Sequence, residues 1–290
     1  MRCVKKYGQN PIFVPNYTGK MELKLNTMKQ AKNQANKMVL FLIALFIFSN
    51  CLPVSAQLSP ESEVSILTIG QGDELYSSFG HSALLISDPQ LHVQNVYNYG
   101  TFSFDNDFYA KFTKGQLDYM LSVSPLQIEY YSWTAAENRD VVQQVLDLNL
   151  DEKNKLYNFL EKNALPENRV YRYNYFYDNC SNRLDSALKI ILGQRVQFFS
   201  KEVSKEHNRS GASIRQLTHD YLQKNKWGEL GIETCLGIEM DRKIKDEQFK
   251  FLPDYLMWNY DKAILKTTDG KYIPLVKEKV HLYTPREQWG

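Results

Sequence analysis

An apolar run of 11 residues, residues 38–48, divides this 290-residue chain into two unlike parts. The run belongs to a leader, residues 1–56, that carries eight basic residues and one acid, and Val54-Ser55-Ala56 supplies the small residues that signal peptidases need. The pattern predicts a secretory signal peptide that is cleaved after Ala56. An uncleaved anchor is the weaker alternative, because a membrane-spanning helix needs about 18 apolar residues or more.

The charge of the chain changes once the leader is removed. Residues 57–290 keep 27 basic and 32 acidic side chains, a formal charge of −5, so the pI near 8.1 belongs to the leader. A nucleic-acid-binding protein usually has a basic stripe in its folded part, and the sequence contains none. We therefore expect an exported globular domain over residues 57–290 without a nucleic-acid partner.

Short apolar segments separated by turn residues dominate the first half of this domain, which predicts an antiparallel meander. The expected strands are residues 65–69, 81–86, 93–104, 119–123 and 141–146. Residues 105–114 are expected to be helical. Residues 151–165 have apolar side chains at helical spacing and end at Pro166, so an amphipathic helix is expected there.

A second helix is expected to begin at about Cys180 and to end at Gly193, because apolar residues recur at helical spacing behind Asp178-Asn179. The tyrosine-rich residues before it, 168–177, are expected to be extended. After it we expect a polar surface loop at 200–212, helical or mixed segments at 214–223 and 227–240, and a closing strand at 272–276. The fold class is therefore α+β, an antiparallel sheet packed with helices.

Export leaves two cysteines, Cys180 and Cys235, in an oxidising compartment, where a disulfide between them is one interpretation. The alternative is that Cys180 is a free, reactive thiol, because a helix N-terminus lowers the pKa of a cysteine. Of the five histidines, His81 is the best-placed partner, since it opens an apolar strand directly after Gly80. A buried core cysteine and a hydrogen-bonded structural histidine are the competing interpretations.

Motifs for other chemistries are missing from the sequence. It has no histidine pair at i, i+4, no clustered cysteine pair and no acid-rich calcium loop, so we expect no metal site. It also has no glycine-rich phosphate loop and no Gly-x-Ser-x-Gly elbow. We expect no cofactor.

Four blocks of sequence carry a family resemblance. They are Gly72-Asp-Glu-Leu-Tyr-Ser-Ser-Phe-Gly-His-Ser-Ala-Leu84, Tyr97-Asn-Tyr-Gly-Thr-Phe-Ser-Phe104, Leu165-Pro-Glu-Asn-Arg-Val-Tyr-Arg-Tyr-Asn-Tyr-Phe-Tyr-Asp-Asn-Cys-Ser-Asn-Arg183 and Phe251-Leu-Pro-Asp254. In this order, they resemble the Lnb N-terminal periplasmic domain family, from about residue 64 onward. The family includes a bacterial lipoprotein N-acyltransferase, so the resemblance implies acyl transfer onto the amino-terminal cysteine of lipoproteins in the periplasm.

The order of the histidine and the cysteine is similar to that in the permuted papain-like fold of NlpC-type and lecithin–retinol acyltransferase enzymes. In those enzymes the histidine lies on a strand and Asn-Cys opens a helix, a layout that His81 and Asn179-Cys180 match. The resemblance implies that Cys180 is the nucleophile, His81 its base and Asn98 the residue that orients the imidazole, with Tyr99 and Ser78 as rivals. The amides of Cys180 and Ser181 are the expected oxyanion donors.

Four residues are expected to bind substrate: Arg183, Tyr76, Tyr177 and Asn179. Arg183 suits a phosphate or carboxylate, with pairing to Asp178 or Asp185 as the structural alternative. The tyrosines, Tyr175 included, suit an acyl groove, with half-buried strand positions as their alternative.

The resulting prediction is a periplasmic thiol acyltransferase that takes its acyl chain from a phospholipid or a diacylglyceryl lipoprotein at the membrane surface. The acyltransferase members of the family carry hydrophobic spans after this domain, and none follows here, so we expect a soluble or peripheral relative or a shortened product. Two alternatives remain: a cysteine peptidase or amidase acting on cell-wall peptide, and a non-catalytic envelope binding domain. An apolar tunnel beside Cys180 favours acyl transfer, an open polar groove a peptidase, and a Cys180–Cys235 disulfide the binding domain.

Overall fold

The computed structural model describes residues 28–43, 57–102, 118–223, 226–267 and 269–286. The chain separates into two compact units, residues 1–56 and 57–290. In the first, residues 28–43 form an exposed helix. No helix within the described ranges is both long and apolar enough to cross a membrane. The predicted cleavage site at Val54-Ser55-Ala56 and the helix expected over 105–114 lie outside the described residues.

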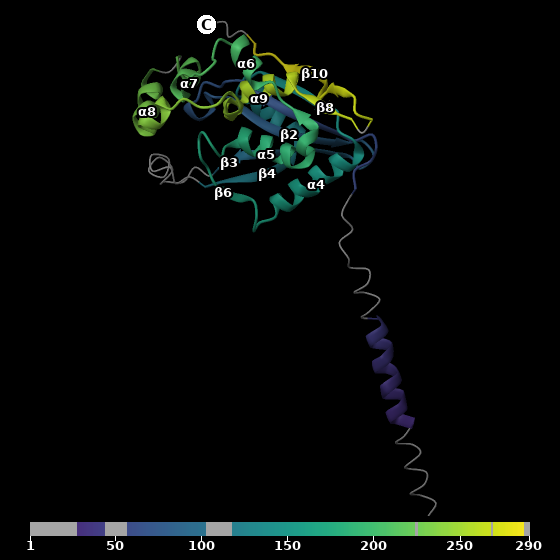
Figure 1. The fold of residues 1–290 in the computed structure, drawn as a ribbon. Coiled ribbons are helices and arrows are strands. Elements are labelled where there is room, and N and C mark those ends of the chain that lie inside the picture. The colour runs from purple at the N-terminus through teal and green to yellow at the C-terminus, as the bar shows by residue number, and fades with distance from the viewer. Residues whose placement is uncertain (1–27, 44–56, 103–117, 224–225, 268, 287–290) are drawn as a thin grey trace, which may run out of the picture. The chain divides into compact units, whose positions relative to one another are not determined.

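Seven strands among the described residues of the second unit form one sheet in the order β10-β5-β1-β2-β3-β4-β6, all antiparallel (Figure 1). The chain order of β1 to β4 is also their order in the sheet, so the predicted meander is confirmed. The strands are β1 (Glu63–Ile69), β2 (His81–Asp88), β3 (Val93–Thr101), β4 (Asp118–Pro125), β5 (Val141–Leu146), β6 (Val170–Arg172) and β10 (Val276–Tyr283). A smaller sheet contains β7 (Val196–Gln197), β8 (Ile264–Lys266) and β9 (Tyr272–Pro274).

Helices cover both faces of the main sheet, which is why β1 and β2 are buried at almost every position, Thr68 and two of their serines included. Ile66 and Leu84 face a core shared with α5, whereas Leu67 and Leu85 face a second core that contains Trp133. The helices are α3 (Leu126–Tyr131), α4 (Leu150–Ala164), α5 (Cys180–Leu192), α6 (Ser200–Glu206), α7 (Ile214–Leu222), α8 (Lys226–Leu236) and α9 (Pro253–Lys262). Short helical segments are η1 (Leu75–Ser77), η2 (Ser132–Ala136), η3 (Gly193–Arg195), η4 (Gly237–Asp241) and η5 (Asp246–Phe251). The predicted α+β class is confirmed.

The start of α5 is fixed by a reciprocal cap. The Asn179 side chain accepts a hydrogen bond from the Asn182 N–H at 2.9 Å, and the Asn182 side chain accepts one from the Asn179 N–H at 3.3 Å. The helix ends at Gly193, which has a φ of 55°. Its buried face packs against β2 and β3 (Figure 1), so the cap places Cys180 in the first turn, against the sheet.

A buried charge cluster joins α5 to η5. Asp185, 8% exposed, contacts Lys250 at 3.1 Å and Lys189 at 2.6 Å, and it accepts a hydrogen bond from the Tyr260 hydroxyl at 3.1 Å. Lys250 is 2% exposed and lies over the Phe198 ring. Burial lowers the pKa of Lys250 to about 8 against the attraction of Asp185. The cluster holds η5, which includes part of the site described below, against the Cys180 helix.

The predicted strand over 168–177 is largely wrong, because only Val170–Arg172 pairs in the sheet. The next residues turn instead. Asn174 and Asp178 exchange backbone hydrogen bonds, and the Asn174 side chain accepts from the N–H groups of Phe176 and Tyr177, both at 3.1 Å. An asparagine that bonds its own backbone in this way favours a turn over a strand.

The predicted polar loop over 200–212 is also wrong in its first half, where α6 forms. Val203 and two small polar residues, Ser200 and Ser204, are buried, and the Ser200 hydroxyl donates to Asn259 of α9 at 2.5 Å. Because these serines have buried hydrogen-bond partners, a segment of polar composition forms a packed helix. At the C-terminal side, β9 lies within the strand expected over 272–276, and β10 continues beyond it into the main sheet.

Candidate active site

Cys180 and His81 meet where the first turn of α5 lies against the start of β2. Gly80 directs the chain into this position with a φ of 77°, a value that side-chain-bearing residues rarely adopt. A Cβ at Gly80 would also lie 2.8 Å from the carbonyl oxygen of Ile69. The glycine before His81 is therefore required both for its backbone conformation and for the close approach of β1.

Asn98 holds the other side of the imidazole. Its Oδ1 lies 2.8 Å from His81 Nε2 and also accepts the Gly100 N–H at 2.7 Å. An amide oxygen only accepts hydrogen bonds, so Nε2 carries its hydrogen toward Asn98 and Nδ1 is left for the hydrogen bond between His81 and Cys180. The structure thus brings together the predicted nucleophile, base and orienting residue.

Two serines join the strand and the helix beside this pair. The hydroxyl of Ser82 lies 3.0 Å from that of Ser181, and both residues are buried. The Ser82 backbone N–H also forms a hydrogen bond with the Cys180 sulfur. The residues that directly follow the histidine and the cysteine therefore hold β2 and α5 in register.

The two titrating groups perturb each other. Burial raises the pKa of Cys180, but the charge and hydrogen bond of His81, helped by Ser82 and Ser181, bring it down to about 7. Burial likewise lowers the pKa of His81, and the charge and hydrogen bond of Cys180 outweigh it, so that the pKa is raised. Near neutral pH this arrangement favours a thiolate beside an imidazolium.

This pairing predicts a specific pH profile. Only the thiolate is alkylated, so the reaction of Cys180 with iodoacetamide is expected to be half-maximal near pH 7 in the wild type and to shift upward in His81→Ala. A shift of one pH unit or more slows alkylation at pH 6 by about tenfold or more. Peptide-resolved mass spectrometry measures both cysteines together, so exposed Cys235 is the internal reference. Equal profiles in the wild type and the variant would exclude the ion pair.

Cys180 forms part of the wall of an apolar cavity of about 260 Å³. The cavity lies between η1, β4, the turn before α5, α8 and η5. Most of the residues that line it are aromatic or aliphatic. The complete lining consists of Glu74, Leu75, Tyr76, Phe79, Gly80, Tyr119, Tyr173, Tyr175, Asn179, Cys180, Ile232, Phe251, Leu252 and Pro253. A thiolate beside such a wall can react with a carbonyl attached to an apolar group that fills the cavity.

The residues predicted to bind substrate separate into two groups. Tyr76 and Asn179 line the cavity, although the Asn179 side-chain amide is also bonded to the carbonyls of Tyr175 and Phe251. Tyr177 and Arg183 do not line it.

Both of these residues have partners elsewhere. Tyr177 is exposed and donates to Glu239 at 2.8 Å. Arg183 forms two hydrogen bonds to Asp178, at 2.5 and 2.6 Å, and lies 4.1 Å from the Tyr171 ring centre. The structural alternative for Arg183, pairing with Asp178, is thus the arrangement that the structure shows.

The imidazole is bonded to Asn98 and not to its two rivals. The Ser78 hydroxyl donates to the Glu74 carbonyl at 3.2 Å, and the Tyr99 ring packs edge-on against the Tyr171 ring. Cys180 and Cys235 are both free thiols, the first buried and the second exposed on α8. The disulfide on which the binding-domain interpretation depends is not formed. Among the described residues, no group of three His, Cys, Asp or Glu residues is arranged to hold a metal ion.

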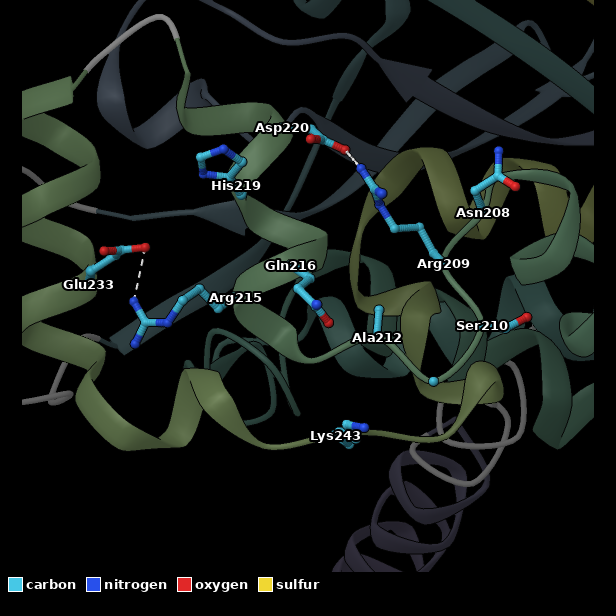
Figure 2. Close-up of a pocket in the computed structure, with 11 residues that line it drawn as sticks. Asn208, Arg209, Ser210, Ala212, Arg215, Gln216, His219, Asp220, Glu233 and Lys243 are labelled. Carbon is cyan, nitrogen blue, oxygen red and sulfur yellow. Dashed lines mark hydrogen bonds and ion pairs between the residues drawn. The ribbon is translucent and has the colours of Figure 1, made fainter.

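A second hollow, of about 720 Å³, lies between α7, α8 and the loop after α6 (Figure 2). It is open and polar. Its two arginines already have partners, since Arg209 pairs with Asp220 and Arg215 with Glu233. Its lining contains no cysteine, so the apolar cavity, in whose wall the Cys180 thiol is paired with a histidine, is the candidate active site.

Several parts of this site were missed by sequence reasoning. Gly100 is one, since a Cβ there would overlap Cε1 of His81. The contact between the hydroxyls of Ser82 and Ser181 is another, since Ser181 was expected to contribute only its backbone amide. Ile232 reaches the cavity wall from a distant part of the chain, and no local signal marks it.

The comparison with protein families matches residues 53–221 to the family described as the Lnb N-terminal periplasmic domain. The chain belongs to this family. The match contains His81, Asn98 and Cys180, and the suspected resemblance is thereby confirmed. Membership in a family of periplasmic domains also agrees with the expected location. Neither the curated proteins nor the solved structures contain a significant match to the chain.

Proposed function

We propose that this Lnb-type domain is a periplasmic thiol acyltransferase, exported by its leader, that moves a fatty acyl chain from a lipid ester to the N-terminal amine of lipoproteins. The observation that carries the proposal is the apolar cavity: a thiol with its pKa lowered to about 7 by a buried histidine lies in its wall. Activated thiols of this kind form covalent acyl intermediates, and the aromatic wall suits a hydrocarbon chain better than a peptide.

In the first half of the reaction, the Cys180 thiolate attacks the ester carbonyl carbon of a phospholipid or a diacylglyceryl group. The carbon–sulfur bond forms and the ester carbon–oxygen bond breaks. The leaving alkoxide takes the proton from the His81 imidazolium and departs as an alcohol. The acyl chain stays on Cys180 as a thioester, and Asn98 keeps the neutral imidazole in place.

In the second half, the amine of the acceptor attacks the thioester carbonyl. The carbon–nitrogen bond forms, the carbon–sulfur bond breaks, and His81 takes the proton that the amine loses. The products are an amide and the original thiolate–imidazolium pair. No co-reactant is required beyond the ester and the amine.

The start of α5 supplies the groups that would stabilise the oxyanion in both halves. The first N–H groups of a helix have no partner within the helix. Asn179 occupies the N–H of Asn182, while the amides of Cys180 and Ser181 belong to the same first turn. We assign these two amides as the donors to the negative oxygen of each tetrahedral intermediate.

The layout also supports the proposed kinship with permuted papain-like enzymes. The histidine lies at the first residue of β2, the asparagine on the neighbouring strand β3, and the cysteine at the first residue of a helix later in the chain. This is the order proposed from the sequence. A peptidase or amidase would use the same pair with water as the acceptor, and the apolar wall is the reason to prefer an acyl chain.

The test uses residues 57–290, which form a compact unit of their own. The protein is incubated with phospholipid and a diacylated lipopeptide, and its intact mass is measured. We expect the wild type to gain the mass of one acyl chain, Cys180→Ala to gain none, and a triacylated peptide to appear only with the wild type. Cys235→Ala is the matched control and keeps both products.

Three other outcomes contradict the proposal. A Cys180→Ala protein that still gains the mass of an acyl chain would show that another residue is acylated. No gain on protein or peptide in any detergent, together with a confirmed free thiol, would favour the peptidase or amidase, to be followed by cleavage of cell-wall peptides. Oxidation of Cys180 to Cys235 in the purified protein would favour the binding domain.

A further inference from the structure

Helix α8 exposes large apolar side chains to solvent. Trp227 is 84% exposed and Leu230 is 55% exposed, and Ile238, in the following segment η4, is 88% exposed. Exposed apolar residues are ordinary when they are scattered singly, but a group of them on one element indicates an interaction surface. We call these three residues the α8 stripe.

The stripe is separate from the face by which α8 packs on the domain. Trp227 and Leu230, with Thr234, follow one another at spacings of three and four, which places them along one side of α8. Ile232 and Leu236, which lie between and beyond them, belong to the inner side, where Ile232 is buried in the core next to the cavity. Ile238 lies after the helix, beyond Gly237, and belongs to the stripe by its exposure. A helix that only covers a core is apolar on one side, so the outer stripe needs its own explanation.

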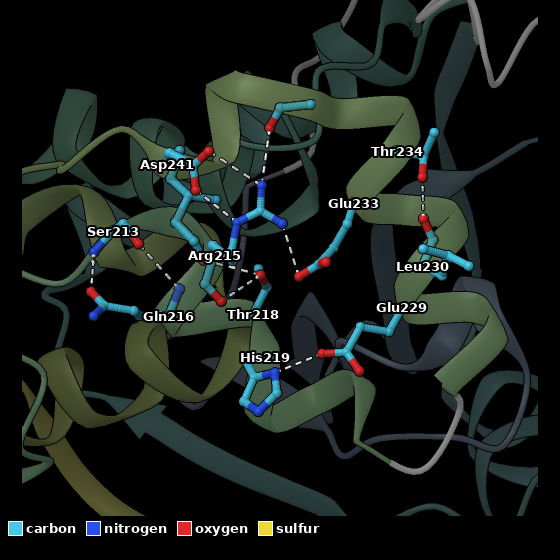
Figure 3. A network of polar contacts seen from close by, with 12 residues as sticks. Ser213, Arg215, Gln216, Thr218, His219, Glu229, Leu230, Glu233, Thr234 and Asp241 are labelled. Atoms are coloured by element: carbon cyan, nitrogen blue, oxygen red, sulfur yellow. Dashed lines mark hydrogen bonds and ion pairs between the residues drawn. The ribbon is translucent and has the colours of Figure 1, made fainter.

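Ion pairs to α7 fix which side of α8 faces outward. Glu233 lies 2.9 Å from Arg215, and Glu229 lies 2.6 Å from His219. Arg215 also contacts Asp241, after the helix, at 2.7 Å. Figure 3 shows the two glutamates pointing from α8 toward α7, whereas Leu230 lies on the other side of the helix. Trp227 and Leu230, the part of the stripe that lies on α8, are thus held away from the domain.

We propose that the α8 stripe docks on a lipid bilayer, with its side chains among the headgroups and the upper acyl chains. Tryptophan with isoleucine and leucine is the composition of interfacial helices. Residues 226–243 carry three basic and four acidic side chains, so this region has no positive excess to attract anionic lipid. Its near neutrality fits a zwitterionic phospholipid surface, bound through apolar contact.

Docking at this position has a consequence for the active site, one that depends on the function proposed above. Ile232 lies on the inner side of α8 and in the wall of the Cys180 cavity. One helix therefore carries both the bilayer contact and part of the acyl site. An acyl chain leaving the bilayer would enter the cavity beside the helix that is anchored there.

The test is flotation of residues 57–290 with phosphatidylcholine vesicles. The leader is left out because its apolar run at 38–48 would itself bind lipid. We expect binding that changes less than twofold between 0.05 and 0.5 M NaCl. Ile238→Ser is expected to weaken it by about tenfold, the effect of removing one inserted aliphatic side chain. The matched control is Ile190→Ser on α5, where the isoleucine is 65% exposed but outside the stripe.

A spectroscopic measurement tests the orientation. Vesicles with brominated acyl chains are expected to quench tryptophan fluorescence of the wild type, and Trp227→Phe is expected to remove most of that quenching. Trp133 is buried and Trp258 stacks on His207, so neither should report on lipid. Trp289 lies outside the described residues and is replaced by phenylalanine in both proteins of this measurement.

Several results would overturn the docking proposal. They are no flotation of the wild type, flotation only with anionic vesicles and only at low salt, or equal weakening by Ile190→Ser. A dimer in solution that Ile238→Ser dissociates, without vesicle binding, would assign the stripe to a second copy of the chain. Cys180→Ala should float like the wild type, because Cys180 lies outside the stripe. A wild-type protein that floats but transfers no acyl chain would reject only the proposed function. Transfer in detergent without flotation would reject only the docking.

Discussion

Replacing Gly100 with alanine is expected to reduce the reactivity of the Cys180 thiol strongly while leaving the domain folded. The new Cβ would overlap Cε1 of His81 and would lie 3.1 Å from both His81 Nδ1 and Asn98 Oδ1. The imidazole must then move away from the thiol, and the pKa of Cys180 rises from about 7 because burial is no longer offset. Acyl transfer should fall by about 10²- to 10⁴-fold, the contribution of a positioned general base.

The measurement pairs two readouts on each variant: the rate of Cys180 alkylation at pH 6 and the rate of thioester formation. Gly231→Ala is the matched control, because a Cβ at Gly231 meets nothing within 4 Å and the residue lies within a helix. Its alkylation should equal that of the wild type. Wild-type reactivity in Gly100→Ala would show that His81 is not held against Cys180 by this strand.

The largest expected effect on stability is that of Asp185→Asn. The substitution keeps the size of the side chain but removes the negative charge that faces Lys250, whose ammonium is 3.1 Å away and almost fully buried. Removing one partner of a buried ion pair typically costs about 3–5 kcal/mol, because the other charge stays buried without compensation. We expect a loss of that order in the free energy of unfolding, measured by urea denaturation of residues 57–290.

The control for this prediction is Lys189→Ala. Lys189 also contacts Asp185, at 2.6 Å, but its side chain is 42% exposed. Exposed ion pairs contribute about 0–1 kcal/mol, so this variant should unfold close to the wild type. An Asp185→Asn protein within about 1 kcal/mol of the wild type would mean that Lys250 is neutral or hydrated in the fold.

The elements around the site whose positions were predicted correctly have local causes. The helix at Cys180 follows from apolar spacing and an asparagine cap, and the strand at His81 from a short apolar segment after a glycine. Asn98 could be expected on the strand next to that of His81, because consecutive strands of a meander lie side by side. These three assignments required no knowledge of distant contacts.

The parts that were missed depend on long-range packing. Ile232 and Phe251 complete the cavity from segments more than 50 residues beyond Cys180 in the chain. The tyrosine-rich segment was assigned to a strand because its composition favours one, yet the Asn174 side chain bonds the backbone and turns the chain. The sequence left two carboxylates, Asp178 and Asp185, as possible ion-pair partners of Arg183. The structure shows that the partner is Asp178.

The hydrogen bond between Ser82 and Ser181 spans 99 residues of chain. It links the two segments that together make the thiol acidic, and neither segment does so alone. Before the fold forms, Cys180 therefore has the reactivity of an ordinary cysteine. The thiol becomes acidic only when β2 and α5 pack together, so folding itself determines when Cys180 is activated.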